Sequence, residues 1–148
     1  MARKVFFSFH HKRDSWRAGQ IRNCDIVKSY EQNRFIDAAS WEAVKIQGDA
    51  VVKKWIESQL LGTSVTVVLI GKETSTRKWI KYEIQRSLEL GKGIIGIDIS
   101  GVKNFLQIID TQGTNPLPAK YPVYSWIKDS GRTNIGRWIE SAAQQAGY

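Results

Sequence analysis

Residues 64–70 constrain the fold of this chain more than any other stretch. Their sequence is SVTVVLI, which is rich in β-branched residues and apolar at successive positions. A strand with one face in water alternates apolar and polar residues, whereas a strand covered on both faces reads as a continuous apolar run. The segment therefore predicts a central strand of a parallel sheet with helices packed on both sides.

Similar patterns extend this prediction along the chain. Further strands are expected at residues 5–9, 34–38, 93–99 and 123–126. Helices are expected at residues 15–27 with Asp14 as the N-cap, and at residues 48–61, 75–91 and 134–146. Residues 100–122 hold the chain's three prolines, so we expect an irregular loop there, with one helical turn near residues 105–109.

Strands that alternate with helices indicate an α/β fold. We expect one domain over residues 1–148, built on a flavodoxin-like doubly wound sheet of about five parallel strands with helices on both faces. The expected strand order is 2-1-3-4-5. Such folds bind ligands at the carboxyl ends of the strands, beside the point where the strand order reverses. The loops after the first three strands should therefore surround one crevice.

The helix at residues 75–91 carries an acidic side chain in an unusual position. On a projection of about 100° per residue, Trp79, Ile80 and Ile84 share one half of the helix circumference. Glu83 lies among them rather than on the charged face. A carboxylate in an apolar arc loses hydration, which is costly unless a partner compensates. Either Glu83 is bonded to a core arginine or a backbone amide, or it faces a cleft where a ligand meets it.

The charge of the chain indicates which classes of partner it could bind, and its cysteine content bears on whether it forms disulfides. The 22 lysines and arginines outnumber the 14 acids, and a net charge of +8 favours a nucleotide, a nucleic acid or an acidic protein as partner, or else a solvated basic surface. The single cysteine, Cys24, excludes an internal disulfide. The chain shows neither a signal peptide nor an apolar run of about 18 residues, so we expect a cytoplasmic protein without a membrane segment.

Four stretches of the chain together resemble TIR domains, and most closely the TIR-like domains of bacterial Thoeris anti-phage defence. They are VFFSFHH near the start, FIDA, SVTVVLIG and, above all, WIKYE, which spans residues 79–83. The resemblance covers roughly residues 3–100. It implies an NAD-cleaving enzyme in which Glu83 contacts the ribose attached to nicotinamide. NAD is then the substrate, with no further cofactor.

The resemblance also implies a product and partners. In Thoeris-type relatives the ribose is recaptured within the molecule, and a cyclic ADP-ribose isomer serves as a second messenger for a separate effector protein. TIR domains commonly self-associate, so a homo-oligomer is expected, and activity is expected to depend on assembly or a trigger.

A substrate pocket around Glu83 follows from the same resemblance. The residues that we expect to form it are Ser8, Phe9, His10, Asp37, Trp41 and Trp79. Each has an ordinary structural alternative: core packing for Phe9 and Trp79, loop anchoring for Trp41, and loop capping for Asp37. Many catalytic TIR domains carry basic residues after the first strand, where this chain has His10 and His11. Neutral histidine binds phosphate more weakly than arginine. On an extended chain, at most one of the two should face the crevice.

Other kinds of site find little support in the sequence. Two adjacent histidines and one distant cysteine do not make a metal site. No spacing supports a catalytic triad, and no glycine-rich phosphate loop is present. Two alternatives to an enzyme stay open. One is a non-catalytic TIR-like module that binds nucleotides or proteins. The other is a basic nucleic-acid-binding domain, against which the dispersed lysines and arginines argue.

Overall fold

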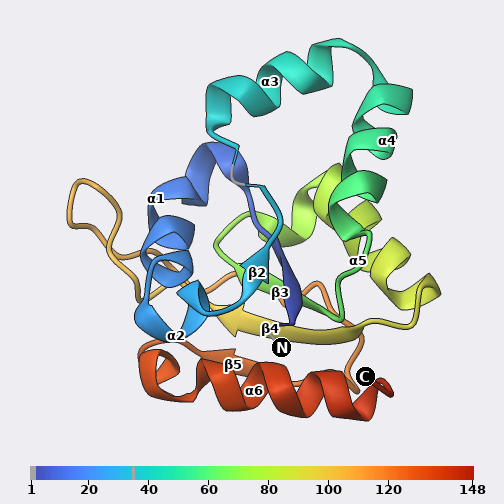
Figure 1. The fold of residues 1–148 in the computed structure, drawn as a ribbon. Helices are drawn as coiled ribbons and strands as arrows, with labels where there is room; N and C mark the ends of the chain where they lie inside the picture. The colour runs from blue at the N-terminus through green and yellow to red at the C-terminus, as the bar shows by residue number, and fades with distance from the viewer. Residues whose placement is uncertain (1–2, 35) are drawn as a thin grey trace.

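A five-stranded, wholly parallel sheet forms the centre of the molecule in a computed structural model that describes residues 3–34 and 36–148. Its order, β2-β1-β3-β4-β5, is the predicted one (Figure 1). The strands are β1 (Lys4–Ser8), β2 (Glu31–Gln32), β3 (Val65–Ile70), β4 (Gly93–Asp98) and β5 (Val123–Ser125). The helices are α1 (His11–Arg22), α2 (Asp25–Lys28), α3 (Ala38–Ile46), α4 (Asp49–Leu60), α5 (Lys78–Glu89) and α6 (Gly131–Gln145), and η1 (Thr74–Thr76) is a short 3-10 turn.

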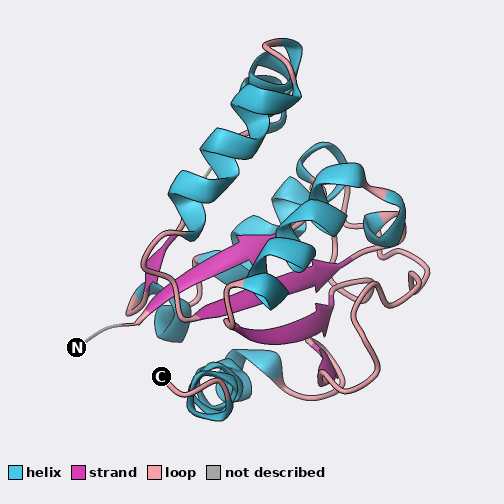
Figure 2. Cartoon of the chain, turned by 90° about the vertical axis from the view of Figure 1, so that its right-hand side faces the viewer, coloured by secondary structure: helices cyan, strands magenta, loops and turns pink. Residues whose placement is uncertain are grey.

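Helices cover both faces of this sheet, as the apolar strands predict (Figure 2). On one face, side chains of β1, β3 and β4 share a core with α1, α2 and α6. On the other face, α4 and α5 pack over the same strands, and α3 lies beyond α4 at the edge of the molecule. Within the described ranges no helix is long and apolar enough to cross a membrane.

The alternation of side chains along β1 decides which residues meet α5. Val5 and Phe7 point into the core shared with α1 and α6, whereas Phe6 belongs to the core on the α4 side. Because successive side chains of a strand point to opposite faces, Ser8 shares the face of Phe6. It is 1% exposed and lies under α5, where it meets Glu83.

The second strand was predicted at residues 34–38, and this is wrong. β2 lies at Glu31–Gln32, and one of the predicted residues, Phe35, falls outside the described part of the chain. The pairing with β1 continues through a side chain, because the Asn33 amide accepts a hydrogen bond from Phe7 N at 2.8 Å and donates one to Phe7 O at 3.2 Å. A side chain that satisfies both backbone groups of the neighbouring strand lets β2 end early.

Helix α3 was not predicted; its first residues were expected to be a loop. Asp37 is its N-cap, and the carboxylate accepts a hydrogen bond from Ser40 N at 2.7 Å. The prediction failed because the apolar residues before Asp37 resemble a strand, and the N-cap that begins a helix was read as the end of that strand.

The first predicted helix differs in its bounds. It begins at His11 rather than Ser15 and breaks after Arg22, with the short α2 following. Asp14 is not the N-cap; it lies in the first turn, is fully buried and pairs with Arg17 at 3.1 Å. Burial raises the pKa of Asp14 to about 6, although the Arg17 guanidinium acts in the opposite direction.

The loop between β4 and β5 is irregular, as predicted, but its stretch at residues 105–109 forms turns and no helix. Two arginines of α1 hold the loop. Arg17 donates to Val102 O at 2.7 Å and to Ile108 O at 3.1 Å, and Arg13 pairs with Asp110 at 2.7 Å. The loop is therefore attached to the helix that follows β1.

Candidate functional site

A cleft of about 550 Å³ opens at the carboxyl ends of β1 and β3, where the strand order reverses. This is the edge at which a doubly wound sheet binds its ligands. The walls come from the residues that follow β1, from α3, from the segment after β3 and from the first turns of α5. The lining residues are Phe9, His10, His11, Lys12, Arg13, Trp41, Glu42, Lys45, Glu73, Arg77, Lys78, Trp79, Ile80 and Glu83.

Glu83 lies on a wall of this cleft and is 3% exposed. Ile80, Glu83, Ile84 and Ser87 form the buried stripe of α5, so the carboxyl group lies in the apolar arc that the helical projection indicates. Its Oε1 accepts a hydrogen bond from Ser8 Oγ at 2.6 Å. Among the described residues, no lysine or arginine forms an ion pair with it. The core arginine considered from the sequence is therefore not its partner.

Burial determines the charge state of Glu83. It raises the pKa of the carboxyl group to about 8, and the hydrogen bond from Ser8 lowers it only in part. At neutral pH the group is therefore mostly protonated. A carboxyl group that has lost hydration without gaining a cation is typical of functional sites, because a ligand can supply the missing charge.

Both histidines after β1 line the cleft, so the expectation that at most one would do so is wrong. It assumed an extended chain, but His11 is already the first residue of α1 and His10 is its N-cap. Burial and the nearby Arg77 lower the pKa of His10, and burial and Arg22 lower that of His11 to about 4. Both rings are therefore neutral at pH 7 and add no positive charge to the cleft.

Aromatic rings form much of the remaining wall. Trp41 stacks on the His11 ring with centroids 4.8 Å apart and an interplanar angle of 21°. The same His11 ring lies 4.5 Å from that of Phe9, which is 2% exposed. Trp79 of α5 is half-buried, and the Lys78 ammonium lies 4.8 Å from its ring centroid. The cleft thus offers flat apolar surfaces from both α3 and α5.

Besides Glu83 and Ser8, five residues were predicted for the site, and four of them line the cleft: Phe9, His10, Trp41 and Trp79. Ser8 lies behind Glu83 and reaches the cleft through that carboxyl group. Asp37 is placed differently, because it is exposed, caps α3 and is not a lining residue. A triad of Ser8, His10 and Asp37 is also not assembled, since the Ser8 hydroxyl is bonded to Glu83 and Asp37 to Ser40.

Five basic side chains of the cleft were not among the predicted site residues: Lys12, Arg13, Lys45, Arg77 and Lys78. Lys12 and Arg13 lie in the first turn of α1, Arg77 and Lys78 lie at the start of α5, and Lys45 lies in the last turn of α3. The first backbone N–H groups of α1 and α5 have no partner within the helix. Free N–H groups and nearby cations together favour anionic ligands. A possible signal was the position of basic residues directly after an apolar strand, as in HHKR after VFFSF.

Arg13 connects the cleft with the loop between β4 and β5. It lines the cleft and lies 3.2 Å from a Glu73 carboxylate oxygen on the neighbouring wall. Another nitrogen of the same guanidinium lies 2.7 Å from Asp110. One guanidinium therefore bridges the two carboxylates.

Comparisons with known proteins agree with this geometry. A family model described as Thoeris protein ThsB, TIR-like domain, matches residues 6–104. A protein of Bacillus cereus (strain MSX-D12), named "Putative cyclic ADP-D-ribose synthase ThsB1", is 37% identical over 140 residues. The aligned part covers 93% of this chain and 72% of that protein. The matched segment includes the end of β1 and all of α3 and α5, and the residues in and directly after these elements provide most of the cleft.

Proposed function

Because this chain belongs to the family of Thoeris ThsB proteins with a TIR-like domain, we propose that it cleaves NAD and makes a cyclic ADP-ribose-type messenger for anti-phage defence. In this reaction the N-glycosidic bond between nicotinamide and ribose breaks, and nicotinamide leaves with the bonding electrons. A nucleophilic atom elsewhere in the same ADP-ribose unit then bonds to the anomeric carbon and loses its proton where it carries one. A separate effector protein would read the product.

The observation that carries the proposal is the carboxyl group of Glu83 on the wall of the cleft. Loss of nicotinamide leaves positive charge on the ribose, as in other glycosidic cleavages. A fixed carboxylate in a site that excludes water stabilises such charge strongly. Glu83 is held by α5 and by Ser8, and it has no competing cation among the described residues.

The substrate itself would set the charge state of Glu83. The nicotinamide ring of NAD carries a positive charge before cleavage, and a cation beside a carboxyl group favours its ionised form. Binding of NAD would therefore release the proton that the buried group holds in the free protein. As the bond breaks, the positive charge moves from the ring to the ribose and stays beside the carboxylate.

The basic and aromatic residues of the cleft suit the pyrophosphate and the flat rings of NAD. The pyrophosphate is anionic, and the basic side chains and free N–H groups at the starts of α1 and α5 are its natural partners. The Trp41 and Trp79 rings offer surfaces on which a flat heterocycle can stack. The neutral His10 and His11 would contribute hydrogen bonds and ring contacts rather than charge.

The decisive experiment compares nicotinamide release by the wild-type chain and by Glu83→Gln. Glutamine has nearly the same shape but cannot ionise, so we expect nicotinamide release and cyclic product to fall at least about a hundredfold. The matched control is Glu89→Gln, at the exposed end of the same helix. Assays with and without lysate of phage-infected cells would supply a trigger.

Three results would count against the proposal. Release of nicotinamide by Glu83→Gln at the wild-type rate would remove Glu83 from the reaction. Binding of NAD by the wild-type chain without nicotinamide release under any triggering condition would favour a non-catalytic nucleotide-binding module. Tight, salt-sensitive binding to nucleic acid without any NAD turnover would favour the basic nucleic-acid-binding alternative.

A further inference from the structure

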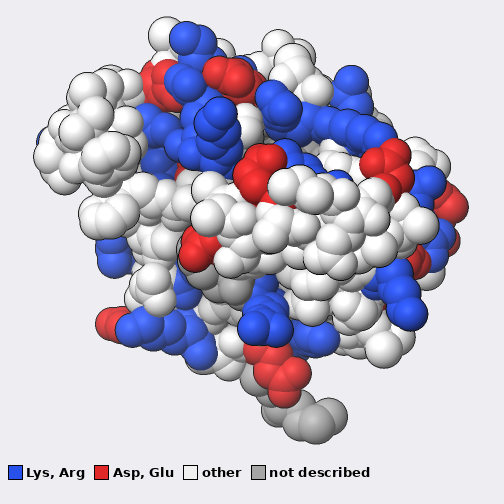
Figure 3. Space-filling view, turned by 90° about the horizontal axis from the view of Figure 1, so that it is seen from above, with Lys and Arg blue, Asp and Glu red and all other residues white. Residues whose placement is uncertain are grey.

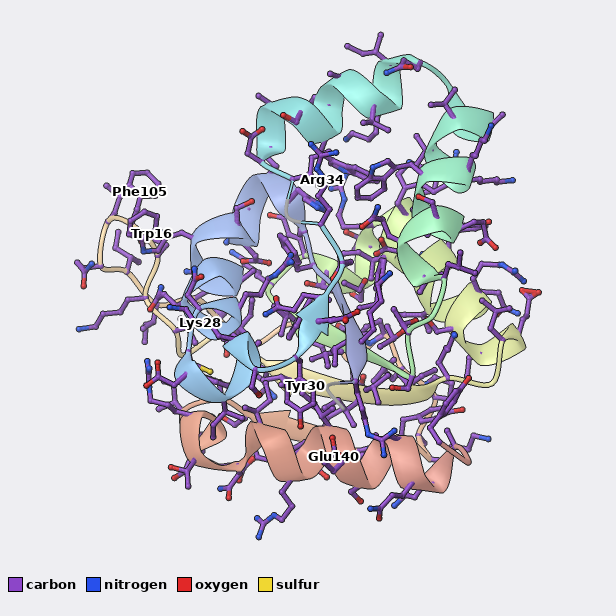
Figure 4. The ribbon with its side chains drawn as sticks, in the orientation of Figure 1. Trp16, Lys28, Tyr30, Arg34, Phe105 and Glu140 are labelled. Carbon is purple, nitrogen blue, oxygen red and sulfur yellow. The ribbon has the colours of Figure 1, made fainter. Side chains whose placement is uncertain are left out.

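Two hydrogen bonds between side chains connect α5 with the sheet in the described part of the chain, and they start from neighbouring strands. Ser8, at the end of β1, donates to the carboxyl group of Glu83 at 2.6 Å. One helical turn further along α5, Ser87 Oγ lies 2.7 Å from Thr66 Oγ1 of β3. Side chains fill the space between α5 and the sheet (Figure 4), and apart from these two pairs they form an apolar core.

The bond between Thr66 and Ser87 continues to the backbone of Glu83. Ser87 Oγ donates to Glu83 O at 2.8 Å, and a hydroxyl group has only one proton to give. Thr66 is therefore the donor in the bond to Ser87. Both hydroxyl-bearing residues are fully buried, so no water competes for these bonds. Glu83 is thus held at both ends, through its carboxyl group from β1 and through its backbone carbonyl from β3.

The register of the sheet explains how two strands reach one helix. Thr66 is paired with Phe6 of β1, and Ser8 follows Phe6 by two residues, so Thr66 and Ser8 project from the same face. Glu83 and Ser87 are four residues apart and therefore lie on one face of α5, a turn from each other. Apolar contacts are non-directional, whereas a hydrogen bond weakens when its angle changes. Two such bonds therefore fix both the rotation of α5 and its position along the strands.

We propose that Thr66 and Ser87 are positioning residues, whose hydrogen bond keeps α5 where the Glu83 carboxyl group meets both Ser8 and the cleft. This inference rests on the proposed function, because the exact position of the carboxyl group matters for rate only if that group takes part in the reaction. Neither residue lines the cleft, so both act through Glu83. For stability alone an apolar pair of similar shape would serve nearly as well. A misplacement of about 1 Å, in contrast, can reduce a catalysed rate about a hundredfold.

The protonation of Glu83 reports whether α5 has kept its position. Burial raises the pKa of the carboxyl group and the bond from Ser8 lowers it, so a shift of α5 that lengthens this bond leaves the pKa higher. Titratable and charged groups from the neighbouring elements line the same cleft, among them His10, Arg13, Lys45, Glu73, Arg77 and Lys78. Within the described ranges none of these groups is hydrogen-bonded or ion-paired to Glu83, and the variants below change none of them.

Two replacements of Thr66 separate its hydrogen bond from its shape. Thr66→Val keeps the shape and loses the hydroxyl, while Ser87 keeps its bond to Glu83 O. We expect the acidic limb of kcat/KM for NAD to move up by about half a pH unit or more. At neutral pH, kcat should fall about three- to tenfold with KM nearly unchanged. Thr66→Ser keeps the hydroxyl and loses a buried methyl group, so it should lower the thermal midpoint more than Thr66→Val but leave the limb near its wild-type position.

A double-variant cycle tests whether Thr66 acts through the bond from Ser8. Ser8→Ala already removes the bond that a displaced helix would weaken, so adding Thr66→Val should move the limb little further. Shifts that simply add would overturn this route. Ser87→Ala breaks the bond from the helix side and should move the limb in the same direction as Thr66→Val. The matched control is Thr63→Val, because Thr63 is equally buried but donates its hydroxyl proton to Leu60 O of α4. It should leave the limb unchanged.

A measurement without NAD separates this inference from the proposed function. The carbon-13 NMR shift of the Glu83 carboxyl carbon, assigned by its loss in Glu83→Gln, follows protonation of the group in the free chain. We expect a higher titration midpoint in Thr66→Val and an unchanged one in Thr63→Val. That result without nicotinamide release by any protein would support the control of Glu83 by Thr66 and count against the proposed reaction. An unshifted midpoint in Thr66→Val, together with wild-type kcat, would overturn the inference and leave the proposed reaction intact.

Discussion

At the scale of single residues, the proton on Glu83 links the environment of one side chain to the activity of the whole site. The free protein holds this carboxyl group protonated up to about pH 8. We therefore expect kcat/KM for NAD to rise about tenfold per pH unit below that value and to level off above it. A pH series of nicotinamide release measures this, and a profile that is flat across neutral pH would contradict it.

Ser8 offers a sharper test of the same group. Its hydroxyl donates to Glu83 Oε1 and lowers the pKa of the carboxyl group against the effect of burial. Ser8→Ala removes that donor, so the acidic limb of the kcat/KM profile should move to higher pH. Ser8→Thr keeps a hydroxyl at the same position and should bring the limb back toward the wild-type pH. An alanine variant with an unshifted limb would show that the hydrogen bond has no influence on the active carboxyl group.

Ionisation of Glu83 should affect stability and activity in opposite directions: as pH rises, kcat/KM should increase while the free energy of unfolding decreases. Between about pH 4.5 and pH 8 the unfolded chain releases a proton from Glu83 that the folded chain retains. The free energy of unfolding therefore falls as pH rises through this window. Glutamine does not titrate, so at about pH 8.5 Glu83→Gln should be about 2–4 kcal/mol more stable than the wild type, with little difference at about pH 4.5.

Urea unfolding of both proteins at the two pH values measures the effect, and comparison at each pH cancels the contributions of Asp14 and His11. The contribution of Asp14 to the free energy of unfolding changes with pH in the same direction as that of Glu83, because burial raises the pKa of Asp14 to about 6. His11 has the opposite sign: its pKa is lowered to about 4, so its contribution is lost as the pH falls from about 6.5 toward 4. A difference between the proteins that does not change with pH would contradict the assigned burial of the Glu83 charge.

At the scale of elements, α3 is the wall of the cleft with the least support from the core. Of its nine residues only Trp41 is buried, and the Trp41 ring packs between the rings of His11 and Trp55. The helix therefore depends on its N-cap, Asp37. Asp37→Ala should lower the free energy of unfolding by about 1 kcal/mol, whereas Asp37→Asn, which still caps, should cost only a few tenths. Thermal or urea unfolding separates the two.

The same pair of variants distinguishes capping from contact with substrate. If Asp37 acts only as a cap, the asparagine variant should keep the wild-type KM for NAD. If Asp37 instead contacts the substrate, as an expected pocket residue would, loss of the carboxylate in the asparagine variant should raise KM although the helix is intact.

The elements that the sequence predicts well are those whose apolar pattern is strong. The buried run of β3, the stripe of α4 and the stripe of α5 appear close to their predicted positions because burial alone defines them. β2 and α3 were misplaced because their position depends on hydrogen bonds that no periodicity encodes. Asn33 replaces a strand residue, and Asp37 begins a helix.

At the scale of the whole molecule, excess positive charge gathers where an anion is expected to bind. Many lysine and arginine side chains lie on the face seen from above (Figure 3). In the lining of the cleft, five basic side chains face three acidic ones, Glu42, Glu73 and Glu83. We expect KM for NAD to rise with salt, because screening weakens attraction between the cleft cations and the pyrophosphate. Arg77→Gln should raise KM and reduce that salt dependence. Lys28→Gln, on α2 and outside the cleft, should do neither.

Steady-state kinetics over a series of salt concentrations would check this expectation. Equal salt dependence in Arg77→Gln and the wild type would show that the cleft cations do not bind the pyrophosphate. The sequence could place Glu83 because helical periodicity locates it on one face. It could not single out Arg77 or Lys45 among 22 basic residues, because only folding brings α3 and the start of α5 to the same cleft.

The guanidinium of Arg13 contacts both the cleft and the loop between β4 and β5. An anion that draws Arg13 into the cleft would take it from Asp110, and this loop would lose one of its attachments to α1. Linkage makes this exchange reciprocal: whatever fixes the loop from outside would alter the affinity of the cleft by the same factor by which the cleft's ligand alters the loop. A single shared cation thus couples the occupancy of the cleft to the arrangement of a loop outside it.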